Sequence, residues 1–337
     1  MSGFVTVSIG SGLVDPIFGK CQVPLASYIE QLGEAFERES LLKYLFHFEN
    51  SRHWAEQHSS ETAMDDFVPV GEGGEYPRTG FESGYDRIIE NMTFKQSFSV
   101  TQELVEDAQL GEMKRRARKL ITAYGRTREK FGRALYAGGI YGTTVSFGGK
   151  SFACNSADGL ALFHKEHVNK VNGKKQCNLY KGSFTASLLG KIETEMQQLT
   201  GDNGELLAVA PDTILIPNDA ALKDAVFSAI GADKEPTTSN NAYNHQFGRW
   251  NVIIDPYLTQ ALAAMGKTDK PFILLDSKFL ETGDGAIFQE RKKLEVKSVV
   301  DQNNDNNSWR GRARFGAGFV DWRFAAAGNI STGKDLT

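Results

Sequence analysis

The chain has 337 residues, of which 40% are hydrophobic and 24% are charged. This composition is typical of globular proteins and excludes a disordered or collagen-like chain. Lys and Arg number 38 and Asp and Glu 42, a net charge of −4, which excludes a protein that binds nucleic acid through an overall positive charge. The three cysteines, Cys21, Cys154 and Cys177, are far apart and odd in number, which argues against a disulfide scaffold.

The sequence contains no candidate membrane segment. No apolar run reaches the ~20 residues that a spanning helix needs. The N-terminal Met1–Phe4 lacks the basic and apolar regions that open a secretion signal. At about 100–200 residues per domain, the length predicts two domains, or one large domain with extensions.

Residues 1–65 are expected to form an extension ahead of a compact body. Met1–Gln22 shows no sustained periodicity. A helix is expected from Pro24, because Ser27 and Glu30 have the spacing of a capping box and apolar residues follow at helical intervals.

Phe67–Phe98 is predicted to be a long β-hairpin excursion. Gly71–Pro77 interrupts regular structure with glycines and a proline, and Phe94, Phe98 and Val100 then follow the alternation of a half-buried strand. Loops of this length are uncommon in compact domains, where ~12–15 residues is the usual ceiling, so a functional role is expected. The alternative is a surface loop without a role.

A long helical region is expected from Ser99, with Gln102 at capping-box spacing, to about Ala137, where Gly138-Gly139 is predicted to end it. Its best-defined part carries mostly apolar residues at alternating intervals of four and three, over roughly 32 Å. This apolar stripe consists of Met113, Ala117, Leu120, Tyr124, Thr127, Phe131 and Ala134.

The charge changes sharply at the start of this helix. Residues 61–112 hold twelve acidic and three basic residues, whereas residues 113–133 hold nine basic and one acidic. Opposite the apolar stripe lies a basic helix face, made of Arg115, Arg118, Arg126 and Arg133. The ordinary interpretation is a solvated helix face. The alternative is a surface that meets an acidic partner, either nucleic-acid phosphates or an acidic segment of a neighbouring chain.

The remainder of the chain mixes helices and strands without an internal repeat. Helices are expected over residues 183–199, 217–230 and 258–265. Strands are expected over residues 206–209, 213–216, 250–254, 272–275, 294–300 and 309–324, the last with glycine kinks at Gly316 and Gly318.

No motif for catalysis or metal binding is convincing. Gly266-Lys267-Thr268 resembles the end of a phosphate-binding loop, but Ala261 stands where its first glycine should be. His164 and His167 are three positions apart and lack two further ligands at typical spacing, so they are expected to be structural or solvent-facing. The sequence contains no Gly-x-Ser-x-Gly nucleophile elbow. A catalytic pair of carboxylates, as in glycosidases, remains an alternative. We therefore expect no catalytic residue, no metal and no cofactor.

Several short motifs occur in a characteristic order over residues 24–328. They are Gly71–Pro77, Phe98–Asp107, Phe131–Gly139, Leu162–His167, Asn178-Leu179, Leu215–Pro217, Val252–Leu258 and Trp309–Trp322. In this order and spacing they resemble the major capsid proteins of tailed bacteriophages, whose fold is shared with herpesvirus capsids and encapsulins. Each motif alone is weak.

The resemblance implies an α+β fold with a long spine helix. Residues 1–65 would form an N-terminal arm and residues 66–98 an extended β-hairpin loop. Residues 99–145 and 287–330 would form a peripheral domain containing the spine helix. Residues 146–286 would form an axial domain inserted into it.

The resemblance also implies a structural protein without enzymatic activity. Such a protein assembles as hexamers and pentamers into an icosahedral or prolate head shell that encloses phage DNA. It is made in the cytoplasm of the bacterial host, becomes part of the virion capsid, and needs no membrane. Because only 65 residues precede the loop, a separate scaffolding protein is expected as a partner. The alternatives are an encapsulin-like cargo shell and, as a different class, an α+β hydrolase.

Two sets of residues acquire roles from the resemblance. The spine helix would lie toward the shell interior, so Arg115, Arg118, Arg126 and Arg133 are candidates for facing packaged double-stranded DNA without sequence specificity. The extended loop would lie over a neighbouring subunit. Its candidate intersubunit residues are Glu72, Glu75, Tyr76, Arg78, Phe81, Tyr85 and Arg87.

Overall fold

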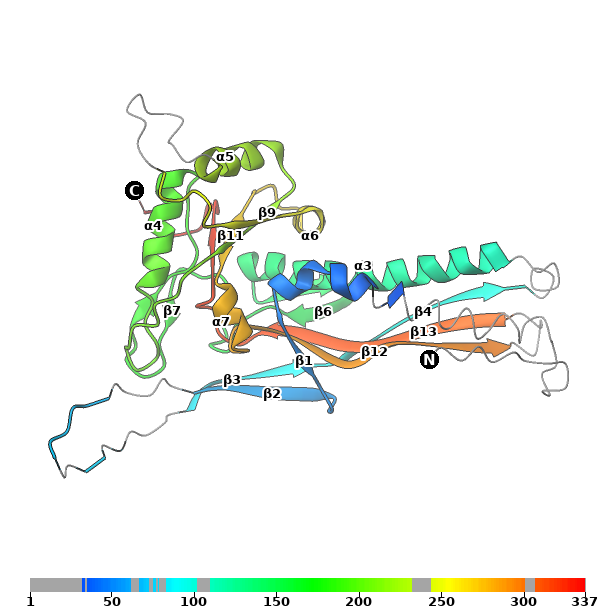
Figure 1. Ribbon diagram of the computed structural model, residues 1–337, viewed down its shortest axis with the longest axis horizontal. Helices are drawn as coiled ribbons and strands as arrows, with labels where there is room; N and C mark the ends of the chain where they lie inside the picture. The colour runs from blue at the N-terminus through cyan, green and yellow to red at the C-terminus, as the bar shows by residue number, and fades with distance from the viewer. Residues whose placement is uncertain are drawn as a thin grey trace.

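The computed structural model describes residues 32–33, 35–61, 67–72, 75–76, 78, 83–101, 110–231, 244–300 and 307–336. It confirms the α+β fold. One long helix lies along a four-stranded sheet, and a second unit, with a smaller sheet and several helices, stands at one end of it (Figure 1). None of the helices in these segments is long and apolar enough to cross a membrane.

The larger sheet combines strands from both halves of the chain. They are β1 (His47–Asn50), β4 (Met92–Val100), β12 (Ala286–Val300) and β13 (Asn307–Phe319). Their order is β1-β12-β13-β4, with β1 parallel to β12 and the other neighbours antiparallel. The glycine-containing strand predicted near the C-terminus is therefore present. At Gly316 a Cβ would lie 2.3 Å from the carbonyl oxygen of Glu90, so only glycine fits there.

Helix α3 (Leu110–Tyr141) covers one face of this sheet with its apolar stripe. Ala117 and Ile121 form a buried cluster with Val100 and Trp309. Farther along the helix, Phe131 lies edge-on to Phe315, with ring centroids 5.8 Å apart. The predicted stripe is confirmed wherever its burial is described: Ala117, Leu120, Phe131 and Ala134 are buried, and Tyr124 and Thr127 are partly buried.

The predicted end of the helix at Gly138-Gly139 is wrong. The helix continues to Tyr141, and both glycines lie inside it and are buried. A Cβ on Gly138 would lie 2.6 Å from the Cβ of Val145, and one on Gly139 would lie 2.8 Å from the Cβ of Leu162. The two glycines therefore permit close packing within the core, a role that a sequence cannot distinguish from that of a helix terminator.

The second unit is built on a sheet in the order β10-β9-β11-β14. Its strands are β9 (Thr213–Pro217), β10 (Asn251–Asp255), β11 (Phe272–Leu275) and β14 (Ala325–Gly328). Strands β9 and β10 are parallel, and β11 is antiparallel to both β9 and β14. All residues of β9, β11 and β14 are buried. Residues 325–328, which the domain prediction grouped with the spine helix, thus pair with a strand of the other unit.

Four helices accompany this sheet, and a polar side chain caps each N-terminus. They are α4 (Ala186–Gln197), α5 (Ala220–Ile230), α6 (Pro256–Ala264) and α7 (Ser277–Glu281), capped by Thr185, Asp219, Asp255 and Asp276. The helices predicted in this region are confirmed. The predicted strand at 206–209 is not, because in that stretch only Leu206 pairs, in an isolated bridge to Thr200.

A projecting hairpin joins β2 (Ala55–Glu61) to β3 (Ser83–Glu90). The excursion thus begins earlier than predicted, within the segment assigned to the arm, while residues 92–100 belong to the larger sheet. The polar run of β2 lacks the apolar alternation that identifies strands. The remaining short elements are η1 (Leu41–Tyr44), β5 (Thr144–Phe147), β6 (Lys150–Ala153), β7 (His167–Val168) and β8 (Lys175–Gln176). The helix predicted from Pro24 begins outside the described residues; residues 35–39 are helical.

Candidate assembly surfaces

The loop of the β2–β3 hairpin presents large apolar side chains to solvent. Phe67 is 100% exposed and Tyr76 is 94% exposed. Near the hairpin base, Trp54 is 65% exposed. Exposed apolar side chains of this size are common on surfaces that a partner covers. Of the other predicted loop residues, Glu72, Glu75 and Arg78 are also exposed, and Phe81 lies outside the described residues.

Tyr85 and Arg87, also predicted to be intersubunit residues, are half-buried against their own subunit. Arg87 donates from Nη1 to Asn155 Oδ1 at 2.9 Å, and the Tyr85 hydroxyl donates to the carbonyl of Val168 at 3.4 Å. These two side chains anchor the part of β3 that adjoins the hairpin loop. They are predicted as loop residues because the sequence does not show where the β2–β3 ladder ends and the loop begins.

Three members of the basic helix face are placed as predicted. Arg115, Arg118 and Arg126 are exposed on α3, as are Lys114 and Lys119. The opposite side of the helix packs on the larger sheet, so these cations face away from it. The helix thus presents a row of positive charge, and such a row can attract an anionic partner whatever the detailed shape of that partner.

The fourth member, Arg133, is wrongly predicted to be on that face, because it is fully buried. Its Nε donates to Asp255 Oδ2, and its Nη1 lies 2.6 Å from Glu129 Oε2, an ion pair outside hydrogen-bond geometry. Glu129 Oε1 accepts from Ser40. From Phe131 onward the helix runs through the core and all its sides are covered, so the helical wheel no longer separates exposed from buried positions.

A second basic surface, which sequence reasoning missed, lies on the face of the larger sheet opposite α3. We term Lys95, Lys297, Arg310 and Arg312 the outer sheet face; with Glu295 they line a hollow of about 470 Å³. Trp309 and Ala313, which alternate with the arginines on β13, point the other way and are buried. The alternation of arginines at 310, 312 and 314 is the signal that could have revealed this face.

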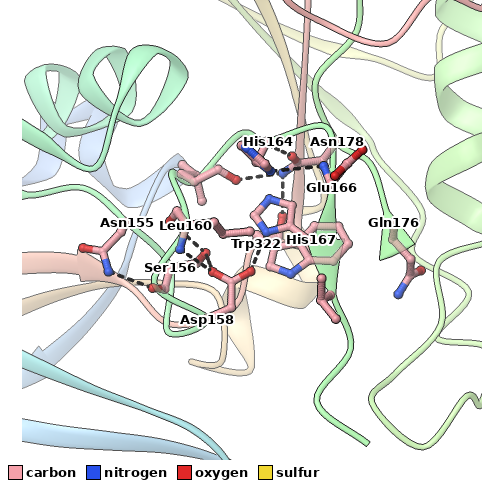
Figure 2. A network of polar contacts seen from close by, with 12 residues as sticks. Asn155, Ser156, Asp158, Leu160, His164, Glu166, His167, Gln176, Asn178 and Trp322 are labelled. Atoms are coloured by element: carbon pink, nitrogen blue, oxygen red, sulfur yellow. Dashed lines mark hydrogen bonds and ion pairs between the residues drawn. The ribbon is translucent and has the colours of Figure 1, made fainter. Parts of the chain in front are cut away.

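His167 is fully buried and belongs to a polar network with Asp158 and Ser156 (Figure 2). Its Nδ1 lies 2.6 Å from Asp158 Oδ2, and its ring stacks on Trp322 with centroids 4.1 Å apart. Nearby, His164 Nδ1 accepts from the Glu166 N–H at 3.1 Å. In the described part of the chain, no three His, Cys, Asp or Glu side chains come together as a metal ion would require.

We expect this network to make the subunit sensitive to acid. Burial raises the pKa of Asp158, but hydrogen bonds from His167, Ser156 and the Leu160 N–H outweigh burial and hold that pKa below its ordinary value of 3.8. A depressed carboxyl pKa stabilises the fold at pH values above the unfolded-state pKa, and the stabilisation is lost as pH falls through the folded-state pKa. Urea unfolding of wild type and Asp158→Asn should therefore differ at pH 7, and the difference should shrink below about pH 4. A difference that does not change with pH would contradict this.

Comparisons with known proteins identify the family of the chain. A family model described as phage capsid protein matches residues 87–328. Among solved structures, this chain is similar to one from Mycobacterium phage Patience, with a TM-score of 0.51 and 12% identity over 98% of this chain and 91% of that one. It is also similar to the capsid of cyanophage P-SCSP1u, with a TM-score of 0.51 and 9% identity over 86% and 87% of the two chains.

The capsid of Myoviridae phage XM1 gives a TM-score of 0.50 at 9% identity, over 85% of this chain and 90% of that one. At these identities the structural matches show the fold alone. A search of curated proteins found no match. The family model, in contrast, covers more than two thirds of the 337 residues and favours a phage capsid over a cargo shell or a hydrolase. The chain therefore belongs to the phage capsid protein family and is a structural subunit of a phage head shell.

Proposed function

We propose that this subunit forms rings of six and of five, and that these rings close into an icosahedral or prolate head around double-stranded DNA. In this proposal it has no enzymatic role, assembles in the cytoplasm of the bacterial host, and works with a separate scaffolding protein. Heterologous contacts that close by rotation produce such rings. The hairpin loop, with Phe67 and Tyr76 exposed, would supply much of the contact by lying over a neighbour.

The observation that carries the DNA-facing part of the proposal is the exposed basic row on α3. Arg115, Arg118 and Arg126 extend over roughly 16 Å of helix on the side away from the sheet. Cations placed in this way reduce the repulsion of packaged phosphates, and they need no contact with base edges. Arg133 has no part in this, because it is buried.

The competing interpretation pairs these arginines with the acidic loop of a neighbour. The outer sheet face weakens that interpretation, because it offers another set of cations on the opposite side of the same layer. A loop that lies over a neighbour can therefore find positive charge without reaching α3. Assembly and DNA contact would then use opposite sides of the layer that α3 forms with the larger sheet.

Reversing the charge of the basic helix face should separate the two interpretations. In a triple variant Arg115→Glu, Arg118→Glu, Arg126→Glu, shells should still form, because the exposed face lies outside the core, but their DNA content should fall roughly tenfold. Electron microscopy measures the shells, and nuclease-protected DNA measures the filling.

The matched control reverses three cations of the outer sheet face, with Lys95→Glu, Arg310→Glu and Arg312→Glu. It changes the charge by the same amount on the other face, and it should affect assembly more than filling. If the helix variant instead fails to assemble, and reversal of Glu72 and Glu75 restores shells, the arginines bind a neighbour's loop. Shells filled with protein instead of DNA would indicate the cargo-shell alternative.

A further inference from the structure

Two short segments of the chain contact the part of β3 that adjoins the hairpin loop. We call residues 153–158 and 167–170 the hairpin socket. From the first segment, the Ala153 carbonyl and Asn155 Oδ1 accept from the two Nη atoms of Arg87, at 3.4 and 2.9 Å. Movement of this part of β3 would therefore break the contacts of Arg87 to this segment.

The second segment holds the start of β3. Lys170 donates from Nζ to the Gly84 carbonyl at 2.5 Å, and its ammonium lies 5.4 Å from the centre of the Tyr85 ring. The carbonyl of Val168 accepts from the Tyr85 hydroxyl. Val168 belongs to β7 and Lys170 lies two residues after it, so these contacts come from a different part of the chain than the first segment.

Asp158 and His167 join the two segments. The carboxylate of Asp158 is tied to its own segment, since Oδ1 accepts from Ser156 Oγ at 2.6 Å and from the Leu160 N–H at 3.0 Å. Its other oxygen accepts from His167 Nδ1 across the socket. His167 is fully buried, and its Nε2 has no hydrogen-bond partner among the described residues. The single hydrogen bond through Nδ1 is therefore the polar contact that orients the ring.

Trp322 packs against the hairpin socket through His167. Its ring is parallel to that of His167, with an interplanar angle of 6°, and it lies just after β13. The first segment is tied to the same place, because the Ala157 N–H donates to the carbonyl of Val320 at 2.9 Å. The socket is thus attached to the end of the larger sheet and holds the hairpin relative to that sheet.

We propose that the Asp158–His167 pair is a latch that keeps the two segments together and so fixes the direction in which the hairpin leaves the subunit. Its importance for shell formation rests on the proposed function, in which the hairpin lies over a neighbour. Asp158 and His167 are positioning residues: neither touches the exposed loop, and both act through Arg87, Tyr85 and Lys170.

Hydrogen–deuterium exchange on unassembled subunits tests the latch directly. In His167→Gln and Asp158→Asn, amides of β3 should exchange roughly tenfold faster, whereas those of β9 should be unchanged, because only the socket opens. Val226→Ala, in the buried face of α5, is the matched control: it removes packing at a distance and should leave β3 unaffected. Unchanged β3 exchange in the latch variants, or an equal increase throughout the subunit, would overturn the proposal.

Lys170→Ala provides a second measurement that does not disturb the buried pair. If the latch acts through the socket, Lys170→Ala should also accelerate exchange at the start of β3, and combining it with His167→Gln should add less than the sum of the two effects. Additive effects would show that His167 acts elsewhere and would overturn the proposal. Because exchange is measured before assembly, a failure to form shells in any background reports on the proposed function and leaves the latch result intact.

Discussion

Replacing Arg133 with Met should lower the free energy of unfolding of the unassembled subunit by about 3–5 kcal/mol. The guanidinium is fully buried between Asp255 and Glu129, and its loss would leave carboxylates of the core without a compensating charge. The same contacts join three parts of the chain, because Ser40 precedes η1, Glu129 lies on α3, and Asp255 ends β10 and caps α6. Urea denaturation followed by circular dichroism measures the change.

Two further variants decide whether the buried charge is responsible. Arg126→Met removes an exposed arginine from the same helix and should change stability by no more than about 0.5 kcal/mol. Adding Asp255→Asn to Arg133→Met should recover part of the loss, since Asn removes one stranded charge and can still cap α6. If Arg133→Met costs less than about 1 kcal/mol, the network does not hold the units together.

Shortening the hairpin should abolish shell formation while the subunit stays folded. Glu61 and Ser83 are partners in the ladder, so residues 62–82 can be replaced by Asn-Gly, a two-residue turn suited to a tight hairpin. The contacts of Arg87 and Lys170 in the socket remain in this variant. The loop's described residues are exposed, so its removal should shift the melting temperature by only ~2–4 °C. Sedimentation and electron microscopy follow the shells.

A milder variant controls for the change in chain length. Phe67→Ser with Tyr76→Ser keeps the loop and removes the two most exposed aromatic rings. It should weaken assembly in proportion to the apolar area that a neighbour covers, with shells still forming at higher subunit concentration. Complete, stable shells from the shortened hairpin at wild-type concentration would show that the loop is dispensable.

Elements whose pattern is set locally could be predicted from the sequence. The stripe of α3 and the buried strand Thr213–Pro217 follow from periodicity and apolar composition, which depend only on neighbouring residues. Strand β2 could not be predicted in this way, because its polar sequence gains its partner only from β3, beyond a long loop. The role of Gly138 and Gly139 could not be predicted for a related reason: the atoms that exclude a Cβ belong to Val145, Cys154 and Leu162, which lie beyond the helix and come close only in the folded chain.

The candidate surfaces show the same difference between features set locally and features set by distant segments. The exposure of Arg115, Arg118 and Arg126 could be predicted, since one helix with one buried side decides it. The burial of Arg133 could not, because the residue that binds it, Asp255, belongs to another unit of the fold. The outer sheet face also depends on pairing: Lys95 and Arg312 become neighbours only when β4 joins β13.

The path of the chain between the two sheets has a consequence for synthesis. The larger sheet needs both β4 and β13, and the smaller sheet is completed only by β14, near residue 328. A ribosome that has made three quarters of the chain has therefore completed neither sheet, and long-range pairing of this kind is slow to form. Chains that end before β13 would lack the outer sheet face and the partner strand of β4. Such incomplete products would therefore be poorly suited to join a growing head.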